Sequence, residues 1–411
     1  MDAEIIAVGS ELLTPQHSDT NSLYLTERLN NLGILVRFKT IVGDSRVDLE
    51  VALHAALERS PLIVLTGGLG PTEDDLTREV VAEVLGRPLH EVAELRQRLE
   101  DRFVHIGRAM PQNNLRQVQV PEGAEWLENR NGTAPGIWIE HKDHVIVLLP
   151  GPPRELEPLF DATCVPRLER LASGARIRTR VYKVVGLPES EVDQLIAPLY
   201  GSCQNPATTI LASLGTIELH LRARAATEQE AEAQLAELGD KIELALGDHV
   251  YSTKGESLEE VVGMYLVMRQ KTLAVGESCT GGLLAERITR VSGSSGYFLG
   301  GAVCYTNEMK TRWAGVPADV ISAHGAVSKT VARALAEGVR ARAGASIGVG
   351  ITGIAGPTGG TNNKPVGLVY VALADERGTQ VREFHFPGSR DRVRHWATQM
   401  ALEMVRRRIK D

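Results

Sequence analysis

Apolar residues in the first 160 positions alternate between short continuous runs and longer stretches with helical spacing. The runs at 4–9, 35–42, 62–68 and 144–151 are typical of buried strands, and amphipathic segments separate the first three. The first of these segments has Asp19 or Thr20 as its N-cap and Gly33 as its stop. Such alternation predicts a parallel sheet covered by helices.

Two further regions follow. Residues 175–250 mix strand and helix patterns, and TIELHLRARA alternates with period two, which is typical of a half-buried strand. This predicts a small α+β module, for which a spacer or dimerisation role is the simplest interpretation. From about 256 the strand and helix patterns alternate again. We therefore expect a multi-domain α/β protein with domains at 1–172, 173–252 and 253–411.

Length and composition narrow the function. The 411 residues are enough for two or three domains. With 45 basic and 52 acidic residues the formal charge is -7, and aromatic residues make up 4%, which argues against direct nucleic-acid binding. The four cysteines are far apart without a CxxC, which disfavours zinc and disulfides and favours reduced thiols in the cytoplasm. No apolar stretch is long enough for a membrane span, and we read no export signal.

A glycine-rich turn lies between the third strand and the next helix, in TGGLGPTEDDLT. Gly67, Gly68 and Gly70 expose backbone N–H groups near a helix N-terminus, where a phosphate could bind. Asp74 and Asp75 open the following helix, and are either helix caps or ligands of a Mg²⁺ that bridges to phosphate. Spacing alone does not decide between helix cap and metal ligand for Asp74 and Asp75. The same two interpretations stay open for Glu11 and Asp19, which lie upstream.

LAVGESCTGGLLAERI is the most informative segment of the third region. Its spacing is G-x-S-x-x-G, so the hydrolase nucleophile motif itself is absent. Ser278 nevertheless lies at a predicted helix N-terminus, where backbone N–H groups could stabilise an oxyanion. In the alternative interpretation, Ser278 and Thr280 only cap the helix.

A nucleophilic serine needs a base. Tyr305, Asn307 and Lys310 follow the next strand and should lie at the same sheet edge as Ser278. A lysine kept neutral by burial could accept the serine proton, although a lone lysine is more often a solvated surface charge. Cys279 is the rival nucleophile, or else an inert buried thiol.

A second glycine-rich loop, GITGIAGPTGG, follows a later strand and would allow a phosphate or sugar to approach its backbone. A long flexible hairpin is the structural alternative. Arg390 and Arg394 are one helical turn apart and should project from one face. Two such arginines suit a phosphate, or they form surface ion pairs.

The first region resembles a known domain. TGGLGPTEDDLT, together with SDTN, NGTAPGI and LPGPPREL, resembles the MoaB/MogA-like molybdopterin-binding domain in the version found at the N-terminus of the CinA (competence/damage-inducible) family. The resemblance implies a metal-dependent ADP-ribose pyrophosphatase with Mg²⁺ or a similar divalent cation at Asp19 and Asp75. It implies nucleotide binding by Gly67, Gly68, Gly70, Pro71 and Thr72.

The third region resembles the C-terminal domain of the same family, through ESCTGG, GGAVCYTNEMK, HGAVS, GITGIAGPTGG, KPVG and FPGSRDRVR. That domain is a nicotinamide-nucleotide amidase, which implies Ser278 as nucleophile, Lys310 as base and Tyr305 nearby, with no cofactor. The implied substrate-binding residues are Thr280, Gly281, Gly282, Asn307, Thr352, Gly353, Gly356, Gly359, Gly360, Arg390 and Arg394. A homodimer is also implied.

The resulting hypothesis is a cytoplasmic enzyme of pyridine-nucleotide recycling. Its C-terminal domain would convert nicotinamide mononucleotide to nicotinate mononucleotide and ammonia, and its N-terminal domain would bind ADP-ribose or a related nucleotide. Two alternatives remain open: a molybdopterin-handling enzyme, and a non-catalytic competence or DNA-damage factor.

Overall fold

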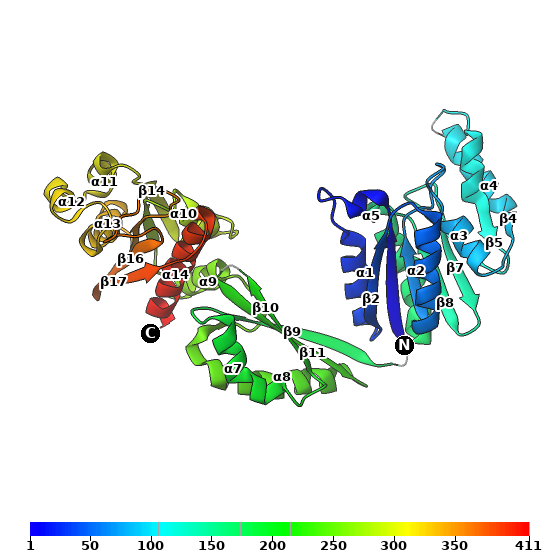
Figure 1. The fold of residues 1–411 in the computed structure, drawn as a ribbon, viewed down its shortest axis with the longest axis horizontal. Coiled ribbons are helices and arrows are strands. Elements are labelled where there is room, and N and C mark those ends of the chain that lie inside the picture. The colour runs from blue at the N-terminus through cyan, green and yellow to red at the C-terminus, as the bar shows by residue number, and fades with distance from the viewer. Residues whose placement is uncertain (106, 173, 214, 411) are drawn as a thin grey trace. The chain divides into compact units, whose positions relative to one another are not determined.

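The computed structural model describes residues 1–105, 107–172, 174–213 and 215–410. The chain forms two compact units, Met1–Arg178 with Ala223–Gln234, and Thr179–Arg222 with Leu235–Asp411. The first unit contains a six-stranded sheet (Figure 1). Its strand order is β2 (Leu35–Val42), β1 (Asp2–Val8), β3 (Leu62–Thr66), β8 (His144–Leu149), β7 (Gly136–His141) and β6 (Glu125–Leu127). The first four strands are parallel, and β7 and β6 complete the sheet by antiparallel pairing.

Helices cover both faces of this sheet, and each face has its own apolar core. One face packs against α1 (Thr20–Asn31), α5 (Pro153–Leu159) and α6 (Val165–Leu171). The other packs against α2 (Arg46–Arg59), α3 (Thr77–Val84) and α4 (Ala93–His105). A two-stranded sheet of β4 (Leu89–Glu91) and β5 (Gln119–Pro121) flanks α4. Short helical turns occur at Ser10–Leu13, Gln112–Val118 and Phe160–Cys164.

The sequence pattern predicts this unit well up to residue 84 and poorly over 88–142. The parallel part of the sheet is confirmed, but β4, β5, β6 and β7 were not predicted. Strands of three residues such as β5 and β6 are too short to show a clear alternation. The helix after the glycine turn begins at Thr77, so the expectation that Asp74 and Asp75 open it is wrong.

The middle module forms a four-stranded sheet in the order β10 (Ala207–Ser213), β11 (Thr216–Ala225), β9 (Arg176–Val184) and β12 (Val250–Ser252). Strand β10 pairs with β11, and β12 with β9, in antiparallel orientation. Its helices are α7 (Glu189–Tyr200) and α8 (Glu228–Leu246). Strand β11 alternates between buried and more exposed residues along its first eight positions, as its period-two pattern predicts. A short turn at Gly247–His249 leads into β12.

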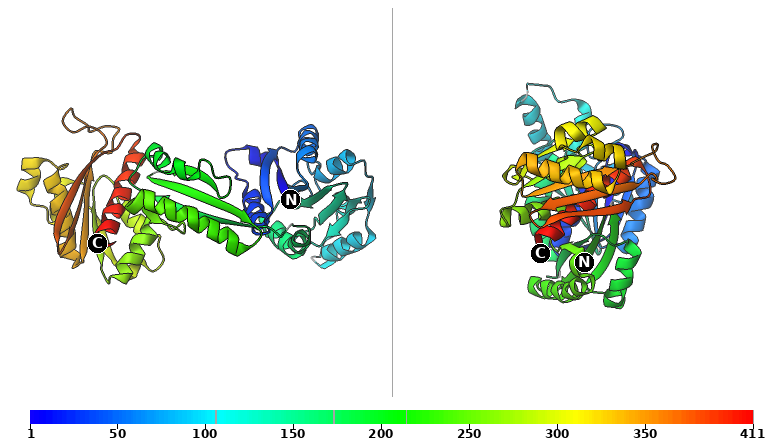
Figure 2. Two further views of the ribbon diagram at one scale, coloured as in Figure 1. Left: turned by 90° about the horizontal axis from the view of Figure 1, so that it is seen from below. Right: turned by 90° about the vertical axis from the view of Figure 1, so that its left-hand side faces the viewer.

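The C-terminal sheet has the order β14 (Phe298–Val303), β13 (Leu273–Glu277), β15 (Ile347–Gly353), β16 (Leu368–Asp375) and β17 (Gly378–His385). Its first three strands are parallel and the last two antiparallel. One face packs against α9 (Leu258–Met268), α10 (Leu283–Thr289) and α14 (Arg390–Lys410). The other side carries α11 (Asn307–Ala314), α12 (Ala318–His324) and α13 (Lys329–Ala343), drawn in yellow to orange in Figure 2. Ser294–Gly296 forms a short turn.

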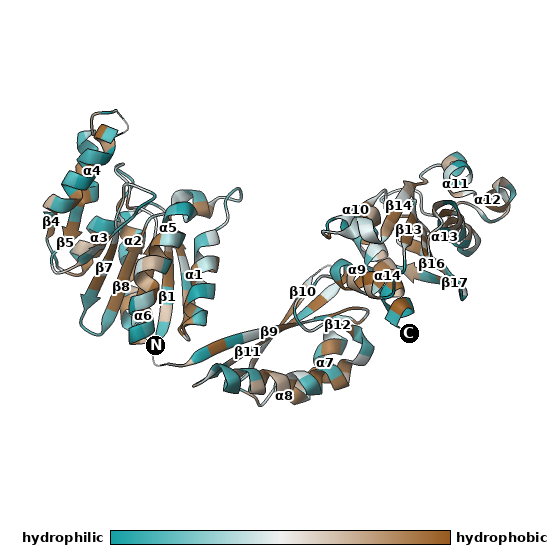
Figure 3. Ribbon diagram, turned by 180° about the vertical axis from the view of Figure 1, so that it is seen from behind, coloured by the Kyte–Doolittle hydropathy of each residue, from teal (hydrophilic) through white to brown (hydrophobic). Residues whose placement is uncertain are grey.

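This topology brings the candidate chemistry to one edge. The carboxyl ends of β13, β14 and β15 lie side by side, so the loops that follow Glu277, Val303 and Gly353 meet there. Hydrophobic residues gather on the central strands of both terminal sheets, and hydrophilic residues are more frequent on the outer helices (Figure 3). Among the described residues, no helix has both the length and the apolar character needed to cross a bilayer.

Candidate functional site

Ser278 lies in a tight turn at the end of β13. Its backbone N–H donates to the Ile351 carbonyl at 3.0 Å, which fixes the turn against β15. The side chain is 8% exposed, and within the described ranges its hydroxyl has no hydrogen-bond partner. Gly281 and Gly282 follow with φ of +61° and +95°, values that favour glycine, and they turn the chain into α10. The hydroxyl is therefore held at a fixed place without being used by the fold.

Glu277, the residue before Ser278, caps helix α10. Its carboxylate is 1% exposed and accepts hydrogen bonds from the backbone N–H groups of Gly282 (3.0 Å), Leu284 (3.0 Å) and Ala285 (2.8 Å). The interpretation of Ser278 and Thr280 as helix caps is therefore wrong. An oxyanion held by those three amides is excluded as well, because they are already occupied.

Two other amides of the turn remain. Across the described parts of the chain, the backbone N–H groups of Cys279 and Thr280 donate to no neighbouring residue. The Thr280 hydroxyl is fully buried and also lacks a partner there. These donors lie beside Ser278, which is where an oxyanion formed by attack of its hydroxyl would need them.

Lys310, on α11, is 2% exposed, so the interpretation as a solvated surface charge is wrong. Its ammonium group donates to the Tyr305 carbonyl at 3.1 Å. Burial lowers the pKa of Lys310, and the thiols of Cys279 and Cys304 are near enough to interact with it electrostatically. Among the described residues Lys310 Nζ makes no direct hydrogen bond to Ser278 Oγ.

The thiol of Cys279 is poorly suited to act as the nucleophile. Its side chain is 6% exposed. Burial raises the pKa of Cys279 to about 12, because desolvation disfavours the thiolate. At neutral pH this sulfur is therefore protonated, which leaves the neighbouring serine hydroxyl as the candidate nucleophile.

Two arginines of α14 reach this edge of the sheet. Arg390 donates to the Tyr305 hydroxyl at 2.7 Å and to the Gly356 carbonyl at 2.8 Å. Arg394 donates to the Thr280 carbonyl through Nε and Nη2, at 3.2 and 2.9 Å. Arg394 also forms a 3.4 Å ion pair with the exposed Asp391. The helix thus connects the Tyr305 loop, the second glycine loop and the Ser278 turn.

The other predicted substrate residues divide by exposure. Asn307, Gly359 and Gly360 are exposed, whereas Gly356 is buried. The fully buried Thr352 donates its hydroxyl to the Ala326 carbonyl at 2.8 Å, and a Cβ at Gly353 would lie 2.7 Å from the Leu368 carbonyl oxygen. Thr352 and Gly353 therefore support the loop from inside. Substrate contacts by this whole set remain predictions.

The N-terminal glycine turn is built differently. Gly67 has φ +93°, and a Cβ there would lie 2.2 Å from the Val8 carbonyl oxygen, so only glycine fits. Asp75 closes the turn by accepting from the Thr72 N–H at 2.9 Å and the Thr72 hydroxyl at 2.5 Å. Arg116 donates to the Thr72 carbonyl at 2.7 Å. The acid of this turn therefore binds a hydroxyl, whereas the acid of the C-terminal turn binds helix amides.

The predicted metal ligands are engaged in the fold. Asp19 caps α1 by accepting from the Ser22 N–H at 2.9 Å, and Asp75 accepts from Thr72. No group of three or more His, Cys, Asp or Glu side chains in the described chain could hold a metal ion. Carboxylates are nevertheless suitable donors for Mg²⁺, which often takes only one or two of them and completes its shell with phosphate and water.

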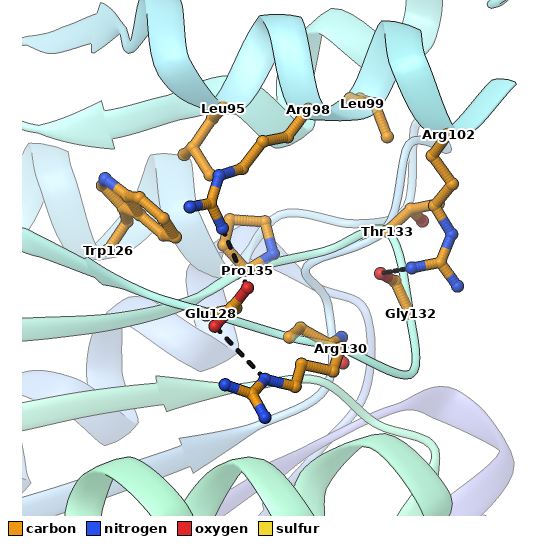
Figure 4. Close-up of a pocket in the computed structure, with 11 residues that line it drawn as sticks. Leu95, Arg98, Leu99, Arg102, Trp126, Glu128, Arg130, Gly132, Thr133 and Pro135 are labelled. Atoms are coloured by element: carbon orange, nitrogen blue, oxygen red, sulfur yellow. Dashed lines mark hydrogen bonds and ion pairs between the residues drawn. The ribbon is translucent and has the colours of Figure 1, made fainter. Parts of the chain in front are cut away.

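A pocket of about 420 Å³ in the first unit was not predicted from the sequence (Figure 4). Its apolar lining is Leu95 and Leu99 of α4 with Trp126 and Pro135. Its charged residues are Arg98, Arg102, Glu128 and Arg130. Arg98 pairs with Glu128 at 2.9 Å, whereas Arg102 donates to the Gly132 carbonyl at 2.8 Å and has no carboxylate partner among the described residues.

This pocket borders the loop 128–135, which contacts the strand ends. Asn129 donates to Glu155 at 2.9 Å, and Asn131 donates to the Arg154 carbonyl at 2.9 Å, just after β8. Gln117, next to Arg116, donates to Thr133 at 3.2 Å. In the sequence, the NGTAPGI segment of this loop could have indicated a site here. The arginines of α4 belong to no recognisable motif, so the sequence did not connect them with the loop.

Glu277 is the main residue that sequence reasoning missed in the C-terminal site. The signal was present: an acid that ends a strand, followed by two glycines and a helix, is close enough to reach the free N–H groups of the first turn. Serine and threonine were preferred because they are the usual N-cap residues.

The fold and the two glycine turns define the class: a multi-domain α/β protein with a MoaB/MogA-like N-terminal region and a separate C-terminal α/β domain. Family models match as the probable molybdopterin binding domain over 4–170, the damage-inducible protein CinA KH domain over 179–252 and the CinA C-terminal domain over 255–409. A CinA-like protein of Koribacter versatilis is 54% identical over 413 residues, covering 100% of both chains. The chain belongs to the CinA family.

Other relatives extend the comparison. A putative competence-damage inducible protein of Acetivibrio thermocellus is 44% identical, covering 100% of this chain and 99% of the relative. The crystal structure of a competence/damage inducible protein from Agrobacterium tumefaciens is 32% identical with a TM-score of 0.36, covering 39% of this chain and 100% of that one. A Thermus molybdopterin biosynthesis enzyme MoaB is 22% identical with a TM-score of 0.29, covering 42% of this chain and 96% of that one.

Proposed function

We propose that the C-terminal domain is an amidase that hydrolyses the carboxamide of nicotinamide mononucleotide. The observation that carries this proposal is a buried lysine with a lowered pKa, Lys310, at the sheet edge that holds the unpartnered hydroxyl of Ser278. A neutral amine can accept a proton at moderate pH, and a serine hydroxyl needs that help to attack an amide.

In the proposed reaction, Ser278 Oγ attacks the carboxamide carbon while its proton passes to Lys310, through a water or the substrate. The N–H groups of Cys279 and Thr280 donate to the developing oxyanion. The C–N bond then breaks as Lys310 returns the proton to the leaving ammonia. Water attacks the resulting ester with Lys310 as base, which releases the carboxylate and restores Ser278.

Arg390 and Arg394 would receive the substrate phosphate, because both guanidinium groups reach this edge from α14. Tyr305 would be held by Arg390 at the mouth of the site. The direct test is incubation of the full chain with nicotinamide mononucleotide and measurement of ammonia. Ammonia released by wild type and not by Ser278→Ala supports the proposal, and none from wild type would reject it.

The N-terminal domain is proposed to bind ADP-ribose or a related nucleotide and to cleave its diphosphate with a divalent cation. The N–H of Gly67 donates to the Leu149 carbonyl, so a phosphate at this turn would be bound by Gly68, Gly70 and the residues that follow. In the pocket bordered by the loop 128–135, Trp126 would contact a base, and Arg102, which has no carboxylate partner among the described residues, would contact an anion. Asp19 and Asp75 would hold the cation, whose charge would neutralise the phosphates. Release of AMP from ADP-ribose, and its loss in chelator, is the test.

The middle module gives an observation against the nucleic-acid alternative. A KH domain usually grips nucleic acid with a G-x-x-G loop, and residues 179–252 contain no such spacing. The same range has eleven Asp and Glu against five Lys and Arg, a net charge of -6 that would repel phosphates. We therefore favour the enzyme over a DNA-damage factor that acts by direct DNA binding.

A further inference from the structure

The turn between β10 and β11 of the middle module contacts helix α14 through a buried glutamine. Gln399 is 1% exposed, and its Nε2 donates to the Gly215 carbonyl at 3.1 Å and to the Thr216 hydroxyl at 3.0 Å. Packing is tight, since a Cβ at Gly215 would lie 2.8 Å from Gln399 Cγ. Thr216 Oγ1 is also 3.3 Å from the Tyr251 hydroxyl of β12.

The same glutamine holds the helix that follows Ser278. Gln399 Oε1 accepts from Arg287 of α10 at 2.7 Å. Arg287 is 6% exposed and also donates to Thr398 at 2.9 Å and to Glu259 of α9 at 2.9 Å. A buried network of this kind is fully satisfied only when every partner is in place, and the module turn supplies two of the acceptors.

This network and the active-site contacts join the same two elements. Arg394, five residues before Gln399 on α14, binds the Thr280 carbonyl in the turn that precedes α10. Arg287 forms the second connection between α10 and α14, further along both helices, through Thr398 and Gln399. Two connections fix the relative position of two helices better than one, because a single contact leaves them free to pivot.

We propose that Gln399 is a positioning residue and that the β10–β11 turn of the middle module is a working part of the amidase site. By holding α14 against α10, the turn would keep Arg390 and Arg394 where they meet the substrate phosphate. The module would then be more than a spacer. This inference rests on the proposed amidase function.

The sharpest variant is Gln399→Glu. Its carboxylate still accepts from Arg287 and can accept from the Thr216 hydroxyl, but it cannot donate to the Gly215 carbonyl and places a negative charge against that oxygen, so the contact to the module is weakened. Thr216→Val removes one acceptor of the same contact. Gln380→Glu makes the identical chemical change at an exposed position of β17 and is the matched control.

In the full chain we expect Gln399→Glu to raise KM for nicotinamide mononucleotide about three- to tenfold, with kcat within about twofold, the size typical of coupling through a packed network. Thr216→Val should show a smaller change in the same direction. With nicotinamide riboside, which lacks the phosphate, the KM of Gln399→Glu should match that of Gln380→Glu. An unchanged KM for the nucleotide, or an equal loss with both substrates, would overturn the inference.

A second measurement separates this inference from the amidase itself. Amide hydrogen exchange in 280–289 and 390–396 should be faster in Gln399→Glu than in Gln380→Glu. If wild type releases no ammonia but exchange responds, the proposed function is wrong and the mechanical link is real. If exchange in both segments is unchanged, the link is absent whatever the activity.

Discussion

The two glycine-rich turns of this protein start alike and place their acids differently. Each follows a buried strand at the carboxyl edge of a sheet and leads into a helix. In the first turn, the carboxylate of Asp75 accepts a hydrogen bond from the Thr72 hydroxyl, so that hydroxyl is already engaged. In the second, Glu277 is buried beneath the turn and satisfies three amides of α10, so the hydroxyl of Ser278 stays free.

The comparison shows how one acid decides what a turn can do. A carboxylate that caps the helix internally removes those amides as an anion site but leaves the neighbouring hydroxyl unengaged. A carboxylate that binds its own loop keeps an oxygen near solvent, where it can meet a cation or a phosphate-bound water. The first arrangement suits a nucleophile, and the second suits a binding cradle.

The largest expected effect is the difference in activity between variants of Ser278 and variants of its neighbour Cys279. Ser278→Ala should lower ammonia release from nicotinamide mononucleotide by about 10³-fold or more, because the covalent step is lost. Cys279→Ala should keep most of the activity, since burial holds the pKa of Cys279 at about 12 and the thiol stays protonated. Steady-state ammonia assays on both variants decide the matter. An inactive Cys279→Ala beside an active Ser278→Ala would show that sulfur is the nucleophile.

The next effect concerns the base. Lys310→Arg should be nearly as damaging as Lys310→Ala, because a guanidinium does not give up its proton near neutral pH. In wild type, kcat/KM should rise with pH as Lys310 loses its proton, and burial should place this rise below the pH expected for an exposed lysine, because it lowers the pKa of Lys310. A pH–rate profile checks this. Near-normal turnover by the arginine variant would mean that only positive charge is needed.

The sequence predicted the frame of both sites better than their interiors. Strands β1, β3 and β13 and helix α1, for which Asp19 was one of two predicted caps, follow from local periodicity and capping rules, which act over a few residues. The role of Glu277 and the Arg287–Gln399 contact depend on burial and on residues far apart in the chain. Such interactions leave no local pattern, so only the folded arrangement reveals them.

A smaller effect is expected from the buried cap. Glu277→Gln removes the charge and leaves one side-chain oxygen for three amide donors, and its own NH₂ group faces them. We expect the C-terminal unit to lose about 1–3 kcal/mol of stability, the usual cost of unsatisfied buried groups. Denaturant unfolding measures the loss, and Asp391→Asn at an exposed site is the control. Unchanged stability would mean that water replaces the carboxylate at no cost.

The smallest effect on stability is expected in the other turn. Asp75→Asn keeps an oxygen that can accept from the Thr72 N–H, and the turn lies at the surface, so the change in stability should stay within about 1 kcal/mol.

The lost charge should nevertheless remove any metal-dependent cleavage of ADP-ribose, because an amide is a poorer ligand for a hard cation. Amidase turnover should not change, since Asp75 and Ser278 belong to different compact units. The measurement is AMP and ammonia release by the same preparation. Cleavage that survives the substitution would reject the carboxylate–metal role, and a parallel fall of both activities in a folded variant would show that the two units are coupled.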